Sequence, residues 1–480
     1  MKRAALAALL LTLLTLLALS VALARGTASS PVLRTLELPQ GDGIVALATD
    51  ARTGHVFVSI STPSGSLIRA LTAATGASWR TITGSYTTRA PVLVVAPLSA
   101  HVFVAQAAAG HLTRVRMLDA RTGTALRTVL TGLSPALMTI DGAGQRVAVA
   151  SSGDTSCPGA SPCPPPRGGV SVLDAASGRV LRRWRLPLQI AAIGLDMRAN
   201  RLVIASANDP GRAGTVSIVD VANGRLLHRT PLALPPARVI MDDLTGRAFI
   251  LSGFNAGPSP VTQASGRIDI LDTRTGTLLR SIPLASPPSA AAIDTRTGHV
   301  FVLDRGPARL VRAQTTSGGL GTWLPTGPGH ALMLDARSGR VLRVIPVGIS
   351  PAGMAVDTAR ARVYIVNQGG RDAYGAINGT PLQLTAPLRG PGGLTILDAA
   401  SGRHLRTIAL GTAPTAVAVD AHAGRAFIAD QGATTRSSAP DPWEWVPARL
   451  RTWILLVPPP PPAGRFVTTP SSIIVLDTNR

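Results

Sequence analysis

Short apolar runs separated by polar turns recur along the chain from residue 31 to its end. In one clear unit, an apolar run ends at Asp294, a turn leads to Gly298, and a second apolar run ends at Asp304. The same arrangement follows at 331–345, where Asp335 and Gly339 separate two more runs. Runs of this length bounded by turn residues are typical of β-strands. We interpret each unit as four strands, A, B, C and D, of a repeat protein.

The turns share an Asp that closes one strand and a Gly that opens the next. Asp side chains bond to nearby backbone N–H groups, and Gly accepts the positive φ of a tight hairpin turn. The A–B turns are expected to start at Asp50, Asp141, Asp196, Asp242, Asp294, Asp357 and Asp420, and the C–D turns at Asp119, Asp174, Asp220, Asp272, Asp335 and Asp398.

The repeat predicts an all-β fold, an eight-bladed β-propeller of four-stranded antiparallel blades. The A strands are expected to begin near residues 44, 91, 135, 190, 236, 288, 351 and 414. Two units depart from the pattern, because Thr72 replaces an Asp in the first and Pro97 lies in a turn of the second. Seven blades remain the alternative if the second unit is irregular.

The two ends of the repeat are complementary. The last unit has strands A, B and C, ending at Asp477, but it lacks a D strand. The segment 31–38 resembles a D strand with no A, B or C before it. Pairing the two would complete the last blade and remove the open edges of the array. We therefore predict one propeller domain, 31–480, closed by its N-terminal strand.

The segment Tyr364-Ile365-Val366-Asn367 resembles the signature of the YVTN-repeat β-propellers, and 301–304 and 427–430 are looser copies. The Asp-x-x-x-Gly turns and the Leu405–Ile408 type of D strand fit the same family. The resemblance covers residues 31–480. It implies a propeller fold and an exported protein, and it says little about activity because members of that family are mostly of unknown role.

Long segments occur only between strands B and C, at 151–168, 253–265, 304–329, 367–392 and 430–471. In a propeller these connections share one face with the D–A connections, whereas the A–B and C–D turns lie on the other face. Insertions confined to one face of a repeat array favour a working surface there. The alternative is unconstrained drift of surface loops.

A Trp- and Pro-rich insertion at about 436–465 is the most unusual of these segments. It contains Trp443, Trp445, Trp453 and Ile454, followed by five consecutive prolines. Apolar residues recur at helical spacing over 446–457. We name these four residues as contacts for a partner or a membrane. The alternative is a short helix that packs over the ring as a cap.

The N-terminus has the order of a secretory signal. Lys2 and Arg3 precede an apolar run that ends in Ala22-Leu23-Ala24. We expect residues 1–24 to be a signal peptide or an uncleaved N-terminal membrane anchor, and the rest of the protein to be extracytoplasmic, either secreted or at the cell surface.

The formal net charge is +22, and removing residues 1–24, which contain Lys2 and Arg3 but no acid, leaves +20. This charge favours attraction to a protein or to an anionic surface polymer or lipid. The arginines are scattered, however, which is typical of a solvated outer face. Aromatic residues make up 3% of the chain, so the interleaved stacking residues of a nucleic-acid groove are missing. We expect a monomer that does not bind nucleic acid.

Cys157 and Cys163 are the only cysteines and lie in a Pro- and Gly-rich segment. In an oxidising compartment, such a close pair predicts a local disulfide. A metal site would need more Cys or His nearby.

Enzymatic motifs are missing from the sequence. Glu occurs only at Glu37 and Glu444, most Asp residues belong to the repeat turns, and no nucleophile elbow, zinc motif or phosphate loop is present. His55 and His299 occupy one repeat position, which indicates a structural role. We expect no catalytic residue, no metal and no cofactor.

Polar residues gather where the B strands end. Ligand-binding candidates at these positions are Asp304, Arg305, Asn367, Gln368, Arg371, Asp430 and Gln431. They could hold a small polar ligand at the mouth of the ring, or they could simply cap strand ends. The favoured function is non-enzymatic binding or scaffolding through the long loops. The alternatives are a propeller enzyme (hydrolase, lyase or cofactor-dependent dehydrogenase) and a purely structural envelope protein.

Overall fold

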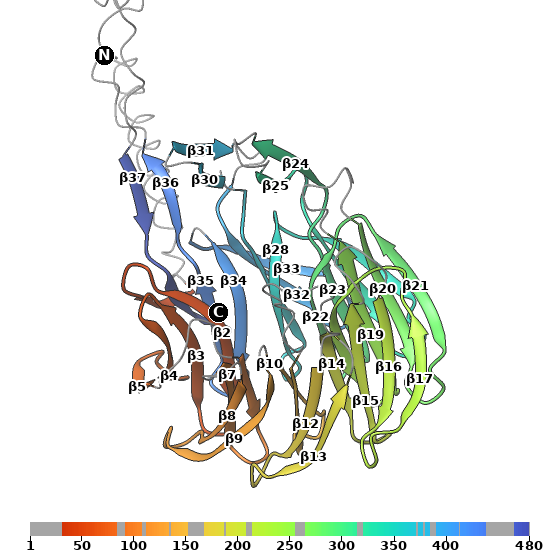
Figure 1. Ribbon diagram of the computed structural model, residues 1–480. Helices are drawn as coiled ribbons and strands as arrows, with labels where there is room; N and C mark the ends of the chain where they lie inside the picture. The colour runs from red at the N-terminus through yellow and green to blue at the C-terminus, as the bar shows by residue number, and fades with distance from the viewer. Residues whose placement is uncertain are drawn as a thin grey trace, which may run out of the picture.

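The computed structural model describes residues 31–83, 92–107, 112–133, 136–151, 168–186, 189–207, 214–254, 265–313, 320–370, 373–377, 380–384, 390–411, 413–437 and 465–479. These residues form eight four-stranded antiparallel sheets and three two-stranded ones, and none of them is helical. Within these ranges there is accordingly no apolar helix of membrane-spanning length. The predicted eight-bladed propeller is confirmed (Figure 1).

The first four blades follow the chain in order. Blade 1 is β2 (Gly43–Asp50), β3 (His55–Thr62), β4 (Gly65–Thr72) and β5 (Ser78–Thr83); blade 2 is β6 (Val92–Ala96), β7 (His101–Ala107), β8 (Leu112–Asp119) and β9 (Ala125–Leu133); blade 3 is β10 (Ala136–Ile140), β11 (Arg146–Ser151), β12 (Gly168–Asp174) and β13 (Val180–Leu186); blade 4 is β14 (Ile190–Asp196), β15 (Arg201–Ala207), β16 (Gly214–Asp220) and β17 (Leu226–Pro231).

The other four blades continue the pattern, and blades 6, 7 and 8 each have two extra strands inserted between their second and third strands. Blade 5 is β18 (Pro236–Asp242), β19 (Arg247–Phe254), β20 (Ser265–Asp272) and β21 (Leu278–Leu284); blade 6 is β22 (Pro288–Asp294), β23 (His299–Asp304), β26 (His330–Asp335) and β27 (Val341–Pro346); blade 7 is β28 (Pro351–Asp357), β29 (Arg362–Asn367), β32 (Gly393–Asp398) and β33 (His404–Ala409); blade 8 is β34 (Pro414–Asp420), β35 (Arg425–Asp430), β38 (Ser472–Asp477) and β1 (Val32–Glu37). The first strand of each blade contacts the first strands of its two neighbours, so these eight strands form a closed inner ring.

The hydrophobic core lies between the blades. Each of its eight clusters joins buried residues of two neighbouring blades. Among the described residues, one repeat position on the second strand supplies the six largest fully buried side chains: Phe57, Phe103, Phe249, Phe301, Tyr364 and Phe427. Because each blade buries its faces only against its neighbours, removing the contact between the first and last blades would expose two apolar surfaces.

Closure of the ring depends on the N-terminal strand, as predicted. β1 pairs antiparallel with β38, and Val32 lies opposite Leu476 while Glu37 lies opposite Ser472. The Leu38 N–H donates to the Ser471 carbonyl at 2.8 Å, and the Asp477 N–H donates to the Pro31 carbonyl at 2.9 Å. The first and last blades therefore lie side by side, red beside blue in Figure 1.

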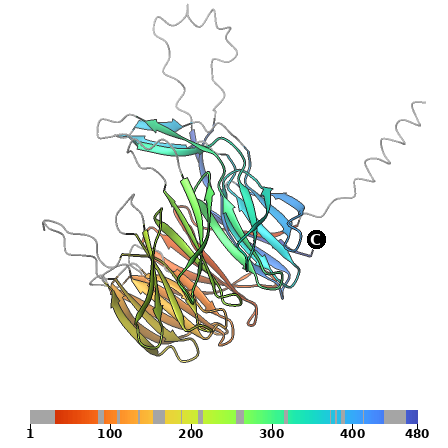
Figure 2. The same cartoon turned by 90° about the vertical axis from the view of Figure 1, so that its right-hand side faces the viewer.

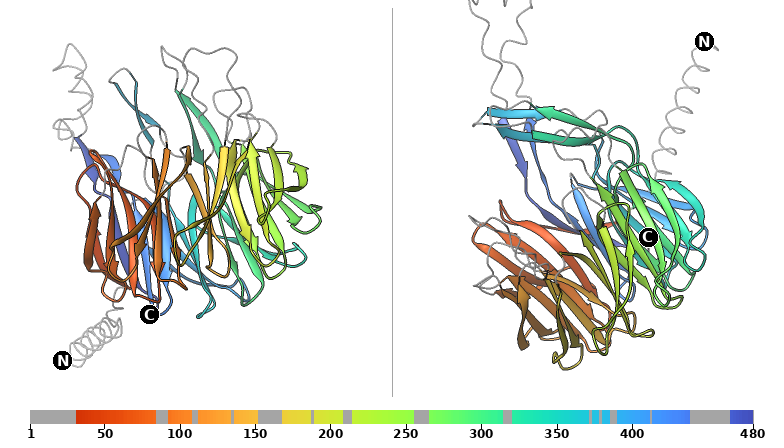
Figure 3. Two further views of the ribbon diagram at one scale, coloured as in Figure 1. Left: turned by 60° about the horizontal axis from the view of Figure 1, so that its bottom comes forward. Right: turned by 45° about the vertical axis from the view of Figure 1, so that its right-hand side comes forward.

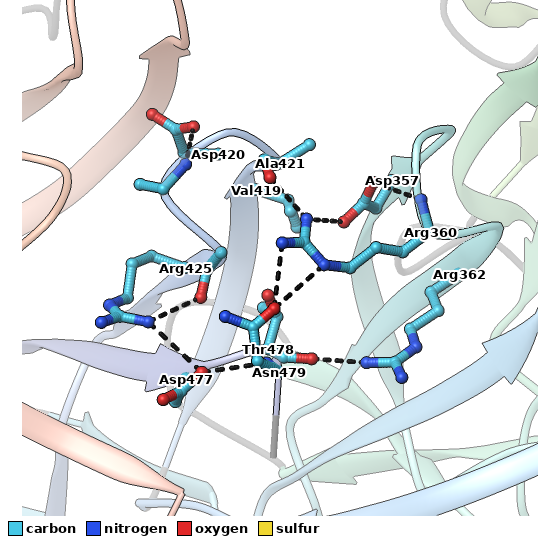
Figure 4. Close-up of polar contacts among 12 residues, drawn as sticks. Asp357, Arg360, Arg362, Val419, Asp420, Ala421, Arg425, Asp477, Thr478 and Asn479 are labelled. Atoms are coloured by element: carbon cyan, nitrogen blue, oxygen red, sulfur yellow. Dashed lines mark hydrogen bonds and ion pairs between the residues drawn. The ribbon is translucent and has the colours of Figure 1, made fainter.

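A polar clasp fixes the C-terminal residues onto blade 7 (Figure 4). The Asn479 side-chain oxygen accepts hydrogen bonds from Nε and Nη2 of Arg360, at 3.2 and 2.9 Å. Arg362 donates to the Thr478 carbonyl, and Asp477 forms an ion pair with Arg425 at 3.3 Å. Since every one of these groups is satisfied within the chain, we assign the clasp to closure of the ring rather than to ligand binding.

The turns follow the Asp and Gly pattern. In nearly every A–B and C–D turn, the fourth residue after the strand-closing one has positive φ, for example Gly298 at 70° and Gly402 at 67°. Where the sequence lacks Gly, the position is held by Ala100, Asn200 or Ala361, with φ between 51° and 55°. The geometry of the repeat thus overrides the local preference of these residues. We call the side of the ring that carries these turns the turn face.

Many of the scattered arginines join one blade to the next. Arg80, Arg182 and Arg343 lie on outer strands and donate to the carbonyls of Thr122, Ala222 and Ser401 in the C–D turns of the following blades. His55 and His299 do the same with the Ala120 and Ala399 carbonyls. The structural role predicted for these two histidines is confirmed. Part of the large positive charge therefore serves packing between blades.

Candidate binding face

Three two-stranded hairpins project from one side of the ring, opposite the turn face (Figures 2 and 3). They are β24 (Ala308–Ala313) with β25 (Leu320–Pro325), β30 (Ala373–Ile377) with β31 (Thr380–Leu384), and β36 (Ala433–Ser437) with β37 (Arg465–Thr469). They connect the second and third strands of blades 6, 7 and 8, respectively. We call this side the hairpin face. The predicted location of the long segments between strands B and C is confirmed, whereas the hairpins themselves were not predicted.

The three hairpins start from the same sequence, Asp or Asn, any residue, then Gly. The glycines are Gly306, Gly369 and Gly432, all with positive φ, between 65° and 83°. A Cβ atom on any of them would collide with a carbonyl of the returning chain, at Pro328, Gly390 and Thr469 respectively. Only glycine allows the two roots of each hairpin to approach this closely.

Asp304 and Asp430 lie at these roots and are buried. The Oδ1 atom of Asp304 accepts hydrogen bonds from the Gly306 N–H at 3.0 Å and from the Ser286 hydroxyl. Oδ1 of Asp430 accepts from the N–H groups of Gly432 at 2.9 Å and Ala413 at 2.8 Å. Each carboxylate thus stabilises the turn that leads into its hairpin.

Asn367 is the equivalent residue of blade 7 and is only 3% exposed. Its Nδ2 donates to the Thr395 hydroxyl at 3.1 Å, while its Oδ1 is buried without a hydrogen-bond partner. Gly348 lies directly against this side chain. Asn367 thus combines a hydrogen-bonded nitrogen with an oxygen that has no partner among the described residues.

The remaining sequence candidates differ in accessibility. Gln431 is committed to the chain, because its Nε2 donates to the Ile44 carbonyl of blade 1. Gln368 is half-buried, and its backbone N–H donates to the Ser350 carbonyl at 3.0 Å. Arg305 is exposed, and the described part of the chain gives its side chain no partner. Arg371 lies outside the described residues. The structure therefore places Asp304, Asn367 and Asp430 at matching roots, and Arg305, which directly follows one of them, is exposed.

Three further sequence predictions fall outside the described residues. These are the signal peptide or membrane anchor at 1–24, the contact residues Trp443, Trp445, Trp453 and Ile454, and the disulfide Cys157–Cys163. All three stay predictions.

An arginine on the inner ring was missed by the sequence interpretation. Arg238 is the third residue of β18 and is exposed to solvent. It is the only charged residue on the eight inner strands apart from the acids that close them. This contrast can be read from the sequence once the A strands are aligned, so the sequence did contain a signal for Arg238. Although both residues are exposed to solvent, neighbouring protein atoms displace part of the water around the guanidinium groups of Arg238 and Arg305, and this lowers the pKa of each.

An acidic group lies at the other end of the inner ring. Asp243 of blade 5 accepts a hydrogen bond from the Gly142 N–H of blade 3 at 2.8 Å. Burial raises the pKa of the Asp243 carboxyl to about 6, and the nearby charges of Asp196, Asp141 and Asp242 add to the effect. Among the described residues, no group of three or more His, Cys, Asp or Glu side chains could hold a metal ion.

The segments on the hairpin face differ in charge between the two halves of the ring. The three that carry hairpins, 305–329, 368–392 and 431–471, contain nine Arg against three acids, a net charge of +6. The segments 152–167, 208–213 and 253–264 of blades 3 to 5 contain two Arg and two Asp, and are neutral. The positive charge of this face is therefore concentrated on neighbouring blades 6 to 8.

Comparison with known proteins gives a family. A family model described as outer membrane protein assembly factor BamB matches residues 111–407, more than half of the chain. No curated protein matches the sequence.

Several solved structures share the fold at low sequence identity. The Dos1 propeller is 9% identical with a TM-score of 0.53, and the match covers 93% of this chain and 94% of that one. Quinohemoprotein alcohol dehydrogenase from Comamonas testosteroni is 12% identical with a TM-score of 0.52, covering 93% and 76%. A europium-containing methanol dehydrogenase is 11% identical with a TM-score of 0.50, covering 93% of each chain. At these identities the likeness concerns the fold alone.

Proposed function

The chain belongs to the β-propeller family described as outer membrane protein assembly factor BamB, and we propose that it is an extracytoplasmic binding propeller whose hairpin face recognises an anionic surface. The observation that carries the proposal is the arrangement of three hairpins on neighbouring blades of one face. The turn face has no comparable extension in the described residues.

Charge supports an anionic partner. The hairpin-bearing segments carry +6 and the other long segments of the same face are neutral. Clustered arginines attract phosphate groups, which guanidinium binds through paired hydrogen bonds. The shared chemistry that we propose is a surface of clustered phosphates, supplied either by lipid headgroups or by a polymer of the cell envelope.

The Trp-rich insertion supports contact with such a surface. Trp443, Trp445 and Trp453 lie between β36 and β37, together with Ile454 and two arginines. Tryptophan and arginine are enriched at membrane interfaces and at the energetic centres of protein interfaces. We propose these four residues as contacts of the third hairpin.

Three further proposals concern processing and relationship. We propose that residues 1–24 direct export, that Cys157 and Cys163 then form a disulfide, and that the repeat around Tyr364–Asn367 relates the chain to the YVTN-repeat propellers. Mass spectrometry of the exported protein tests the first two. Removal of the leader lowers the measured mass by that of residues 1–24, and the disulfide lowers it by the mass of two hydrogen atoms.

A co-sedimentation assay tests the binding function. Vesicles containing phosphatidylglycerol should bind the protein, and vesicles of phosphatidylcholine alone should not. Soluble polyphosphate distinguishes the two sources, since it should compete fully if phosphate charge alone is recognised and only in part if the lipid interface contributes. Replacing 438–464 by a Gly/Ser linker should weaken binding, because it removes the Trp contacts while leaving the net charge of the face unchanged, and replacing 152–167 by a similar linker is the matched control. Equal binding to both vesicle types, or equal loss in both variants, would contradict the proposal.

An enzyme is the second candidate, and the alcohol and methanol dehydrogenases among the structural neighbours favour it. The described residues offer no group of acids, histidines or cysteines for a metal, so no residue is assigned to such a role. Native mass spectrometry with metal analysis of the purified protein tests this candidate. A stoichiometric metal or organic cofactor would support the enzyme over the binding protein.

A further inference from the structure

Blades 1 and 2 lie side by side, with β3 and β4 packed against β7 and β8 (Figure 1). Toward the turn face their interface is apolar and forms one of the eight core clusters. Members of this cluster are Phe57, Ile68 and Ala70 of blade 1 and Val102, Val104 and Leu118 of blade 2. We call the other end of this contact, toward the hairpin face, the polar end of the blade 1–2 interface.

Four polar residues lie at the polar end. On β4, Ser66 comes two residues before a member of the cluster. On β7, Gln106 comes two residues after one, and on β8, Arg116 and Arg114 come two and four residues before one. Residues two apart on a strand share a face, and the pairing of β3 with β4 and of β7 with β8 is regular. All four residues therefore lie on the faces that the two blades turn toward each other, and Gln106 lies directly opposite Arg114.

Two of these side chains are buried polar groups with an unsatisfied atom. Gln106 is 3% exposed and Ser66 is 8% exposed. The Gln106 Oε1 and the Ser66 Oγ have no hydrogen-bond partner among the described residues. Buried polar atoms in folded proteins nearly always bond to protein, to water or to a ligand. Arg114 and Arg116 are only half-buried, so solvent reaches this end of the interface.

The polar end receives positive charge and no negative charge from the two blades. Residues 43–133, which contain both blades, include only two acids, Asp50 and Asp119. Both close strands at the turn face, which is the opposite end of the interface. The carboxylate that a pair of half-buried arginines would normally attract is therefore not supplied by either blade.

Blade 5 shows how the fold satisfies an arginine at this repeat position. Counted back from the Asp that closes the third strand, Arg267 corresponds to Arg114, and Asp269 corresponds to Arg116. Asp269 is 1% exposed and accepts hydrogen bonds from Nε of Arg267 at 2.9 Å and from the Ser281 hydroxyl. Blade 5 thus provides its own carboxylate, whereas blade 2 has a second arginine in that place.

The donor and acceptor groups at the polar end define the ligand. Guanidinium binds a carboxylate through paired hydrogen bonds, whereas the Gln106 Oε1 can only accept, so the ligand must also carry a donor. Because Arg114 lies opposite Gln106 and is reached by solvent, a change of its rotamer gives a small ligand access to the amide. The Ser66 hydroxyl can donate or accept.

We propose that the polar end of the blade 1–2 interface binds a small hydroxycarboxylate. Its carboxylate takes the place in blade 2 that Asp269 has in blade 5, beside Arg114, and its hydroxyl donates to Gln106. The site goes beyond recognition by the hairpin face, because it lies between two blades whose second and third strands are joined by short connections.

Isothermal titration calorimetry of the purified protein tests the site. Glycolate is the probe, acetate lacks its hydroxyl, and ethylene glycol lacks its charge. We expect one saturable site for glycolate, about fivefold weaker binding of acetate, and none of ethylene glycol. Arg114→Gln should weaken binding of both acids about tenfold, through loss of a charge-assisted hydrogen bond. Gln106→Leu should lower the affinity for glycolate to that for acetate and leave the affinity for acetate unchanged.

Three controls separate the site from general charge, from misfolding and from the hairpin face. Arg127→Gln removes the same charge from an exposed position on the outer strand of blade 2 and should leave binding unchanged. Arg114→Lys keeps the charge but loses the paired donors, so it should fold normally and bind about threefold more weakly. Replacing 438–464 should leave glycolate binding intact.

Three results would overturn the proposal. The first is no saturable binding of glycolate by the unmodified protein, which would mean that only water occupies the polar end. The second is equal affinity for glycolate and acetate, and the third is equal weakening by Arg127→Gln and Arg114→Gln.

Discussion

The turn face and the hairpin face are built from the same strands but are constrained very differently. On the turn face, the connections are short, repeat the same Asp and positive-φ positions, and pack against the neighbouring blade. On the hairpin face, the repeat controls only the roots, at Asp304, Asn367 and Asp430, and the segments beyond them vary in length and charge. The turn face therefore supplies stability, and the hairpin face is free to acquire binding functions.

The largest effect should come from a turn glycine that touches the next blade. A Cβ atom at Gly224, which has φ of 75°, would collide with the indole of Trp184 in blade 3. Gly224→Ala should lower the free energy of unfolding by about 3 kcal/mol, through backbone strain and displacement of the indole. The matched control is Gly298→Ala, where φ is 70° but no atom lies within 4 Å. It should cost about 1 kcal/mol, from strain alone. Urea denaturation measures both, and equal losses would show that contact between the blades does not matter here.

Asp294 tests the turn carboxylates. It is fully buried, and its two oxygens accept from the Arg296 N–H at 3.1 Å and from the Thr297 hydroxyl at 2.9 Å. Asp294→Ala should cost about 2 kcal/mol, because it leaves both donors without their partner. Asp294→Asn keeps one acceptor oxygen and should recover part of the loss. An unchanged urea midpoint for the Ala variant would mean that the turn forms without its Asp.

Asp243, which lies on the turn face, should make the free energy of unfolding depend on pH. Its pKa is raised to about 6 in the folded protein from 3.8. As pH rises through this window, the unfolded chain loses the proton first, so the carboxylate costs the folded state stability at pH 7 and costs nothing below pH 3.8. Asp243→Asn should therefore stabilise the protein by about 1–3 kcal/mol at pH 7. Denaturation at pH 4 and pH 7 measures the difference, and an equal effect at both values would contradict the raised pKa.

The smallest effect on stability should come from the hairpin face. Replacing 371–389 by a short Gly/Asn turn keeps the bridge between Gly370 and Gly390 that closes the root of the hairpin. The free energy of unfolding should change by less than about 1 kcal/mol, since shortening a surface loop has a small entropic effect. A loss as large as that of Gly224→Ala would show that this hairpin is part of the structural ring.

Much of the ring could be predicted because each blade repeats its own signals. Asp at a strand end, Gly four residues later and apolar runs between them locate strands and turns without knowledge of the neighbours. The missing D strand after Asp477 and the unaccompanied strand at 31–38 predicted closure, and the pairing of β1 with β38 confirms it.

The candidate sites were less predictable, because the burial of a side chain and its hydrogen-bond partners depend on other blades. From the sequence, Asp304 and Asp430 were candidates for ligand binding, and in the folded chain their carboxylates accept backbone N–H groups at the hairpin roots. Arg238 carried no motif, and its exposed position on the inner ring appears only when β18 is set among the other first strands.

By itself, the sequence determined the repeat, the number of blades, the closing strand and the face that carries the insertions, because these follow from local periodicity and turn chemistry. Only the tertiary structure decided which polar side chains are consumed by the fold and which remain available. The physical reason is that a hydrogen bond from the Gln431 side chain to the Ile44 carbonyl, or from the Gly142 N–H to the Asp243 carboxylate, joins residues far apart in the chain. Whether a polar group is satisfied depends on such distant partners, and no local pattern records them.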